Sequence, residues 1–507
     1  MKRTSLTTAV IAGIAGVAGI SNMASAVYLN QDGLGQVLIY PYYTVNNNNV
    51  TLMTVVNTTN QAKAIKVRYL EAYDSREVLD FNLYMSPHDV WTAAVVPVGQ
   101  GAGVFTTDNS CTVPTVTNTA ANAIPFSTAA FVDGGVLPND GGPSDVTRTL
   151  EGYVELIEMG VVTGNSAGYV THSNGNPKAC PTVYNAWNGG YWDPTAGGNA
   201  NTDITSPSGG LFGSGAIING PAGQIAGYNA DAIDQFASAP NHSAPGSLAP
   251  SIAGGDSYTS YVFTSVPGFT SSQLVATPYQ LSIDAVSSVF MADQIYNEYW
   301  TGGGTSANSE WVVTFPTKRF YVDPTGTGTA VGSNTGASGI LPFQTVFSSA
   351  YGGTSCVDIG LAVYDREERV KGGSINFSPS SPRGTSLCWE AQVVTFNQTI
   401  ASGSTGPSAI LGSNLSTNIS TGFNVGWAMI DLYDKKHLLP ASYTAGKNIA
   451  FLGLPATGFW VTNLVNNNVT HGVLANYSAL FRHKFHRSCV YGTGTNVTTT
   501  QGCIAQP

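Results

Sequence analysis

Residues 65–69, Ile-Lys-Val-Arg-Tyr, alternate apolar and charged side chains with a period of two. In a β-strand this period places Ile65, Val67 and Tyr69 on one face and Lys66 and Arg68 on the other. The pattern predicts a half-buried strand, with its apolar face toward a core and its charged face toward water.

Short apolar or aromatic runs on both sides of this segment are separated by turn residues such as the Asn-rich stretches 46–49 and 57–60. Closely spaced short strands with turn signals between them favour an antiparallel β-sandwich. We therefore predict a mainly β protein with two Ig-like or jelly-roll-like sandwiches, long Gly/Ser/Asn-rich loops and one or two helices. The runs that predict strands are 37–45, 51–56, 78–84, 90–96, 152–162, 311–315, 360–364, 392–396, 426–432, 449–452, 459–464 and 473–480.

The predicted organisation has four segments. These are a signal peptide at 1–26, an N-terminal sandwich at 27–164, a loop-rich middle region at 165–305 and a C-terminal sandwich at 306–507. Apolar residues near helical spacing predict a helix over 279–299. Tyr-Asp-Ser-Arg-Glu at 73–77 and Tyr-Asp-Arg-Glu-Glu at 364–368 are each followed by Asn, Ser-Pro, Trp and Val-Val in the same order. This echo indicates either a duplicated sandwich or a chance resemblance.

The first 26 residues have the pattern of a secretory signal peptide. Lys2 and Arg3 precede an apolar run at 9–20, and Ala24-Ser25-Ala26 forms a small-x-small cleavage signal. The expected destination is extracellular or at the cell surface, with the periplasm as the alternative. No later segment reaches 18 consecutive apolar residues, so we expect no transmembrane helix after cleavage.

The composition narrows the partner classes. Charged residues make up 10% of the chain and the net charge is −10. Nucleic acid is therefore a poor partner, whereas a charge-poor surface leaves little repulsion between copies. An even number of cysteines in an exported chain predicts disulfides. Sequential pairing, the simplest scheme, gives Cys111–Cys180, Cys356–Cys388 and Cys489–Cys503.

Four phrases resemble an uncharacterised group of exported proteobacterial β-rich envelope or surface proteins. They are QVLIYPYY at 36–43, EGYVE at 151–155, WVVTFPTKRFYVD at 311–323 and GLPATGF at 453–459. The resemblance implies a Gram-negative envelope or extracellular setting and transfers no function.

Candidate catalytic residues are sparse. Gly-Asn-Ser-Ala-Gly at 164–168 matches the G-x-S-x-G nucleophile elbow, but the residues after Ser166 predict strand or loop instead of the required helix. Glu151, Glu155 and Glu158 would share a face only on a helix, and their neighbours favour a strand. We therefore expect no enzymatic activity.

Metal and ligand sites have equally weak signals. His483 and His486 lie three residues apart but beside Arg and Lys, which repel a metal cation. The acidic loop 139–145 offers oxygen ligands that suit Ca²⁺, with an ordinary turn as the alternative; no other cofactor is expected. Trp187, Tyr191 and Trp192 cluster in a Gly/Asn-rich loop and are candidates for stacking on a sugar, or for local packing.

The expected function is adhesion or self-assembly at the cell surface or in the extracellular matrix. Assembly could proceed by strand addition, with Val37, Ile39 and Tyr43 in an apolar segment that completes a neighbour's sheet edge. Partners would be further copies, other surface or matrix components, or glycans. The alternative is a secreted hydrolase or glycan-binding protein that uses the 165–260 loops.

Overall fold

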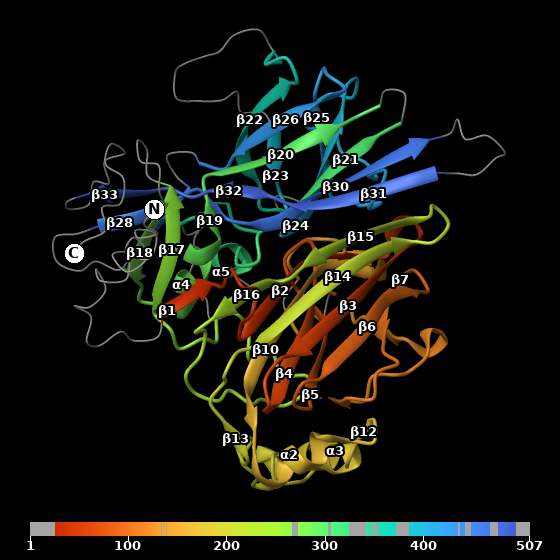
Figure 1. Ribbon diagram of the computed structural model, residues 1–507, viewed down its shortest axis with the longest axis vertical. Helices are drawn as coiled ribbons and strands as arrows, with labels where there is room; N and C mark the ends of the chain where they lie inside the picture. Colours follow the sequence, from red (N-terminus) through yellow and green to blue (C-terminus); the bar gives the residue numbers. More distant parts are fainter. Residues whose placement is uncertain are drawn as a thin grey trace, which may run out of the picture.

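The protein is described by a computed structural model, shown in Figure 1, and its fold is mainly β, as predicted. The described residues are 26–132, 134–137, 139–265, 272–302, 306–323, 341–343, 345–347, 353–371, 385–433, 437–441, 448–466 and 475–492. The predicted signal peptide lies outside the described residues except for Ala26, which begins β1 (Ala26–Leu29).

Two sheets pack face to face in the first sandwich. Phe81 and Trp91, from opposite sheets, meet with ring centroids 5.8 Å apart. One sheet has the strand order β18 (Ser272–Pro278), β17 (Thr259–Ser265), β1, β16 (Asp231–Asp234), β2 (Val37–Thr44), β10 (Glu151–Val162), β4 (Ala62–Glu71), β5 (Glu77–Met85) and β8 (Cys111–Val113), and β13 (Ile204–Thr205) pairs with β10. The other has the order β15 (Gln224–Asn229), β14 (Leu211–Asn219), β3 (Asn49–Asn57), β6 (Val90–Val98), β7 (Gly101–Phe105) and β9 (Ile124–Pro125).

The second sandwich also has two sheets, and the Tyr299 and Phe396 rings stack between them at 5.5 Å. One sheet has the order β23 (Thr385–Leu387), β22 (Val357–Asp365), β26 (Val425–Asp431), β20 (Gln294–Trp300) and β32 (Lys484–His486). The other has the order β25 (Ser416–Ser420), β24 (Ala391–Asn397), β21 (Asn308–Thr314), β30 (Thr457–Asn466) and β31 (Ala475–Arg482).

The two sandwiches repeat one topology. The order β16-β2-β10-β4-β5 corresponds, strand by strand along the chain, to β32-β20-β26-β22-β23, and β15-β14-β3-β6 corresponds to β31-β30-β21-β24. The sequence echo falls at equivalent places, because residues 73–77 lie just after β4 and residues 364–368 span the end of the equivalent β22 and the turn after it. Trp91 lies in β6, and Trp389 lies just before the equivalent β24. The topology therefore supports the duplicated sandwich over a chance resemblance.

Smaller elements complete the described structure. The helices are α2 (Gly164–Val170), α3 (Cys180–Trp187), α4 (Ser282–Phe290) and the short α5 (Arg319–Val322). Three small sheets pair β11 (His172–Ser173) with β12 (Asn176–Pro177), β19 (Met291–Ala292) with β29 (Leu454–Pro455), and β27 (Leu438–Pro440) with β28 (Asn448–Leu452) and β33 (Cys489–Gly492). Among the described residues, no helix has the length and apolarity to cross a membrane.

Residues 165–305 do not form a separate loop-rich region. They supply β14 and β15 to one sheet of the first sandwich and β16, β17 and β18 to the other. The second sandwich begins at β20, before the predicted boundary at 306. Three of these strands pair with strands more than a hundred residues away, β14 with β3, β16 with β2 and β17 with β1, so local composition did not reveal them.

The helix predicted over 279–299 ends at Phe290. Residues 294–300 form β20, in which Ile295, Asn297 and Tyr299 are buried in alternation with more accessible neighbours. This half of the segment has the period-two burial of a strand and pairs with β26, so the helix does not continue into it.

The strand at 65–69 is correct, but it is buried on both faces. Lys66 and Arg68 are as inaccessible as their apolar neighbours. The Lys66 ammonium binds Asp80 at 2.6 Å and the backbone oxygen of Ala244, which belongs to a covering loop. The charged side chains of this alternating strand therefore form buried ion pairs instead of facing water, because other parts of the chain cover this face of the sheet.

Two of the predicted disulfides are present, Cys111–Cys180 and Cys356–Cys388. They indicate an oxidising, non-cytoplasmic environment. The third predicted pair cannot be described, because Cys503 lies outside the described residues.

Candidate functional site

The outer face of the sheet β15-β14-β3-β6 carries several exposed apolar side chains. Along each of these strands one set of side chains points into the core and the alternate set points outward. The outward residues, which we call the uncharged face, are Val50, Leu52, Thr54, Val56, Val90, Thr92, Ala94, Val96, Phe212, Ser214, Ala216, Ile218, Ile225, Gly227 and Asn229. None of them carries a charge.

Register brings these residues into continuous rows across the sheet. Ile225 lies opposite Ile218, which lies opposite Val50, and Phe212 lies opposite Val56. In a parallel row, Thr54 and Ser214 share a hydroxyl hydrogen bond of 2.9 Å. Ile225 is 58% exposed, and Leu52, Val90 and Phe212 are also exposed. A contiguous accessible surface of this kind is typical of a protein-contact site.

The uncharged face continues toward the second sandwich. Strand β15 lies beside β31, where the Ser478 hydroxyl accepts from the backbone N–H of Ile225 (3.1 Å) and donates to its carbonyl (2.6 Å). Beyond this contact Tyr477 is 65% exposed, and Phe481 is also exposed. Figure 1 shows β14, β15, β3 and β6 side by side, with β31 next to β15.

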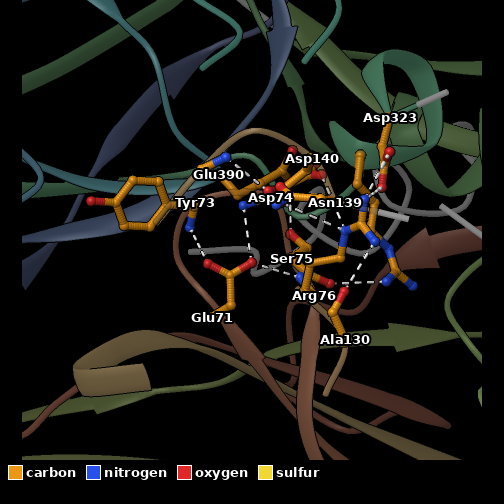
Figure 2. A network of polar contacts seen from close by, with 12 residues as sticks. Glu71, Tyr73, Asp74, Ser75, Arg76, Ala130, Asn139, Asp140, Asp323 and Glu390 are labelled. Atoms are coloured by element: carbon orange, nitrogen blue, oxygen red, sulfur yellow. Dashed lines mark hydrogen bonds and ion pairs between the residues drawn. The ribbon is translucent and has the colours of Figure 1, made fainter. Parts of the chain in front are cut away.

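A second candidate is the buried charge network between the sandwiches (Figure 2). The turn after β4 projects into the second sandwich, where Arg76 binds Asp323 at 3.0 Å and the Ser75 hydroxyl donates to Glu390 at 2.9 Å. The Glu71 carboxylate accepts from the backbone N–H groups of this turn and pairs with Arg148 at 2.8 Å. The network joins parts of the chain that are far apart in sequence.

Lys318 and Glu390 have strongly shifted pKa values in this region. Burial lowers the pKa of Lys318 to about 8, and its ammonium donates to the backbone oxygen of Ser355 at 2.6 Å. Burial raises the pKa of Glu390 to about 8. Such shifts are common at catalytic sites, but both side chains are completely buried. A substrate cannot reach them in this structure, so the network supports a fixed contact between the sandwiches.

The G-x-S-x-G segment lies in helix α2, not in the predicted loop. Ser166 is completely buried, and its hydroxyl donates to Asp203 at 2.9 Å and shares a second hydrogen bond with Tyr191. Asp203 also accepts from the backbone N–H of Ser166 and so caps the start of the helix. Among the described residues, no histidine is hydrogen-bonded to Ser166. These contacts assign the serine to packing.

The glutamates of β10 are also buried. Glu155 pairs with Arg68 and Glu158 with Lys63, each at 2.7 Å. Glu151 accepts from the Tyr42 and Ser413 hydroxyls, each at 2.6 Å. Because each carboxylate is already bound by protein donors, the three do not form a paired catalytic site.

The predicted sugar-stacking residues pack against the first sandwich. Trp192 is completely buried, stacks on Tyr84 with centroids 5.4 Å apart, and donates its indole N–H to the backbone of Thr202. Trp187 donates to the Tyr84 hydroxyl at 2.6 Å, and the Tyr191 ring lies against Trp192. A sugar cannot stack on Trp192, which is part of the local packing. Trp187 and Tyr191 are partly accessible, and ligand stacking on them stays a prediction.

The candidate metal ligands have protein partners. Both ring nitrogens of His483 are hydrogen-bonded, one to Asn297 and one to the backbone of Val312, and His486 binds Asp293 at 2.7 Å. In the acidic loop, Asp140 is bound by Arg148. Within the described ranges, no group of three or more His, Cys, Asp or Glu side chains could hold a metal ion.

The candidate assembly strand is an interior strand. Val37, Ile39 and Tyr43 lie in β2, which pairs with β16 along one edge and with β10 along the other. All three side chains are completely buried. This strand cannot complete a neighbour's sheet without leaving its own, so strand addition by 37–45 is not supported.

These features define a mainly β protein of two topologically equivalent sandwiches with an accessible uncharged face. Comparison with protein-family models, curated proteins and solved structures finds no match. The sequence reasoning missed the face, although the absence of charge from 50–56 and 211–218 is a signal for it.

Proposed function

We propose that this chain is a non-enzymatic, exported protein of the cell surface or extracellular matrix that associates with further copies of itself through the uncharged face. The observation that carries the proposal is the exposed, charge-free surface over β3, β6, β14 and β15. Burial of such surface on association is favourable by about 25 cal/mol per Å².

A second copy is the occupant that the charge distribution favours. Although the few charged residues leave little overall repulsion between copies, the net charge of −10 disfavours contacts that bring carboxylates of two copies together. Two uncharged faces can meet without bringing like charges together. Their Thr and Ser hydroxyls, such as those of Thr54 and Thr92, can also hydrogen-bond across the contact.

Export and an envelope setting belong to the same proposal. The signal-peptide pattern, the disulfides Cys111–Cys180 and Cys356–Cys388, and the resemblance to exported proteobacterial envelope proteins all support it. The protein contacts of Ser166 and the β10 glutamates support a role without catalysis.

The test measures association of the mature protein, residues 27–507, by sedimentation velocity and electron microscopy over a range of concentrations. We expect reversible association in the wild type. Leu52→Lys combined with Ile225→Lys adds positive charge to both partners of a face-to-face contact, so the association constant should fall at least tenfold.

Val136→Lys is the matched control, because it also replaces an exposed aliphatic residue with lysine but lies away from the uncharged face. It should leave association unchanged. A wild type that stays monomeric at every concentration, or a double variant that associates as the wild type does, would overturn the proposal.

A further inference from the structure

We propose that a pocket between the start of the described chain and the segment 482–487 binds an acidic sugar unit through its carboxylate. This site lies outside the uncharged face, and the inference does not depend on self-association. It rests on an arginine that forms no ion pair with any described residue, and on the apolar side chains that line the same pocket.

The pocket has a volume of about 310 Å³ and two chemically different walls. Leu29, Val262, Phe263 and Val289 supply apolar surface, together with Tyr261. Arg482, Lys484 and Arg487 supply the charge, beside the Phe485 ring. Among the described residues that line the pocket, none is acidic, and its size is at the lower end for small-molecule sites.

Arg487 is the main candidate for contact with an anion. Its guanidinium lies over the Phe485 ring, 5.3 Å from the centroid, and it forms no ion pair with a carboxylate in the described part of the chain, although Asp293 attracts it at longer range. The residue is partly buried, and burial together with Arg482 lowers its pKa to about 10. A desolvated cation without an anion is costly, and a bound carboxylate would offset that cost.

The nearby carboxylates are engaged elsewhere. Asp231 pairs with Arg482, and Asp293 accepts from Ser488 at 2.6 Å and binds His486. His483 also lines the pocket, but both of its ring nitrogens are occupied and burial lowers its pKa to about 3. The neutral imidazole adds no charge, so Arg487 and Lys484 are the cations left to receive an anion.

The two walls together select the ligand class. A planar guanidinium matches a carboxylate in two parallel hydrogen bonds. The aromatic and aliphatic wall, with Phe263 exposed, suits the apolar face of a sugar ring. An acidic monosaccharide unit presents both features within the available volume, whether it is free or part of a polysaccharide.

Isothermal titration calorimetry of the mature protein tests the site with sodium glucuronate, glucose, sodium acetate and inorganic phosphate as separate probes. We expect glucuronate to bind more tightly than the other three. Arg487→Gln removes a charge-assisted contact and should weaken glucuronate binding at least tenfold. A glucuronate oligosaccharide then distinguishes a polysaccharide source, for which it should bind more tightly than the monosaccharide, from the free sugar.

Arg366→Gln is the matched control, because that side chain is exposed on a turn of the second sandwich, away from the pocket. It should bind glucuronate as the wild type does. Equal binding of glucuronate and acetate, tighter binding of phosphate, or an Arg487→Gln variant with unchanged affinity would each overturn the inference.

Thermal unfolding without ligand separates a binding role from a structural one. If Arg487 is kept for an anion, Arg487→Gln should have an unchanged or higher Tm, because the variant buries no unpaired charge. A lower Tm would indicate that the arginine stabilises the fold, and would count against the inference.

Discussion

At the residue scale, the buried His242 has hydrogen-bond partners on both ring nitrogens. Trp187 donates to the Tyr84 hydroxyl, which lies 2.8 Å from Nε2 of His242, and Nδ1 of His242 lies 2.5 Å from the backbone oxygen of Ala200. All of these hydrogen bonds form when the imidazole is neutral, with its proton on Nδ1 and the Tyr84 hydroxyl donating to Nε2. Burial accordingly lowers the pKa of His242 to about 4.

Because the pKa of His242 is lower in the folded chain than in the unfolded chain, the free energy of unfolding decreases as the pH falls. The unfolded chain binds a proton at an ordinary histidine pKa of about 6.5, while the folded chain resists protonation until about pH 4. The neutral His242 therefore stabilises the folded state fully above about pH 6.5. This stabilisation, on the order of 3 kcal/mol, is lost as the pH falls to 4.

Urea unfolding at pH 7, 5.5 and 4 measures this pH dependence of stability. His242→Gln is the variant for comparison, because its side chain cannot titrate. The variant should lose stability relative to wild type mainly at pH 7, and the difference should narrow toward pH 4. A difference that is constant over this range would contradict the prediction.

At the scale of elements, the disulfide Cys111–Cys180 fastens helix α3 to the edge strand β8. Helices α2 and α3 carry a small core of their own, in which Val170, Val183 and Trp192 pack against Tyr84 and Met159 of the sheet. Figure 1 shows the two helices together at one end of the molecule. The disulfide closes a separation of 69 residues, so its loss frees a long segment.

Cys111→Ala combined with Cys180→Ala should lower the free energy of unfolding by about 2–4 kcal/mol. Hydrogen–deuterium exchange should rise at 164–187 and stay unchanged at 391–397. The matched variant, Cys356→Ala with Cys388→Ala, should raise exchange near 357–397 and leave 164–187 protected. Equal increases in exchange at 164–187 and at 391–397 in either variant would show that each disulfide does not stabilise only its own region.

At the scale of the whole molecule, one hydrophobic core runs through both sandwiches. Tyr228 of the first stacks on Phe459 of the second at 5.1 Å. The loop 408–415 is held by one glutamate from each side, because Ser413 donates to Glu151 and the backbone N–H of Leu411 donates to Glu310 at 3.0 Å. Burial raises the pKa of both carboxyl groups.

Because the core and these contacts are shared, calorimetry should record one unfolding transition for the two sandwiches. Glu151→Ala leaves buried donors without an acceptor, and we expect the single transition to move to lower temperature, with a loss of about 1–3 kcal/mol. Glu367→Ala, on an exposed turn, should change stability by no more than about 0.5 kcal/mol. Two separate transitions in the wild type would contradict a shared core.

The repeated topology also belongs to this scale. In the first sandwich, the β4–β5 face carries Lys66 and Arg68 under a covering loop. In the second sandwich, the strands that correspond to β10 and β2 are β26 and β20. Trp427 of β26 and Glu298 of β20 are exposed, whereas β10 and β2 are buried along their whole length. One strand order therefore supports two different surfaces.

The sequence by itself determined the β class, two of the disulfide pairings and the existence of most strands. The strands depend on short-range order, because side chains two residues apart share a face of a strand. The disulfides join cysteines that are successive along the chain, so sequential pairing predicts them although the pairs are 69 and 32 residues apart. The similarity between 73–77 and 364–368 also indicated the repeated unit, because each of the two segments lies at the turn after an equivalent strand.

Only the tertiary structure decided which surfaces are accessible. Val37–Thr44 could have been an edge strand, and it is central because β16, from residues 231–234, pairs along its free side. Lys66 could have faced water, and it is buried because a loop some 180 residues later covers it. The uncharged face and the Arg487 pocket have the same origin. Burial depends on which distant segments pack together, and a local pattern of side chains does not contain that information.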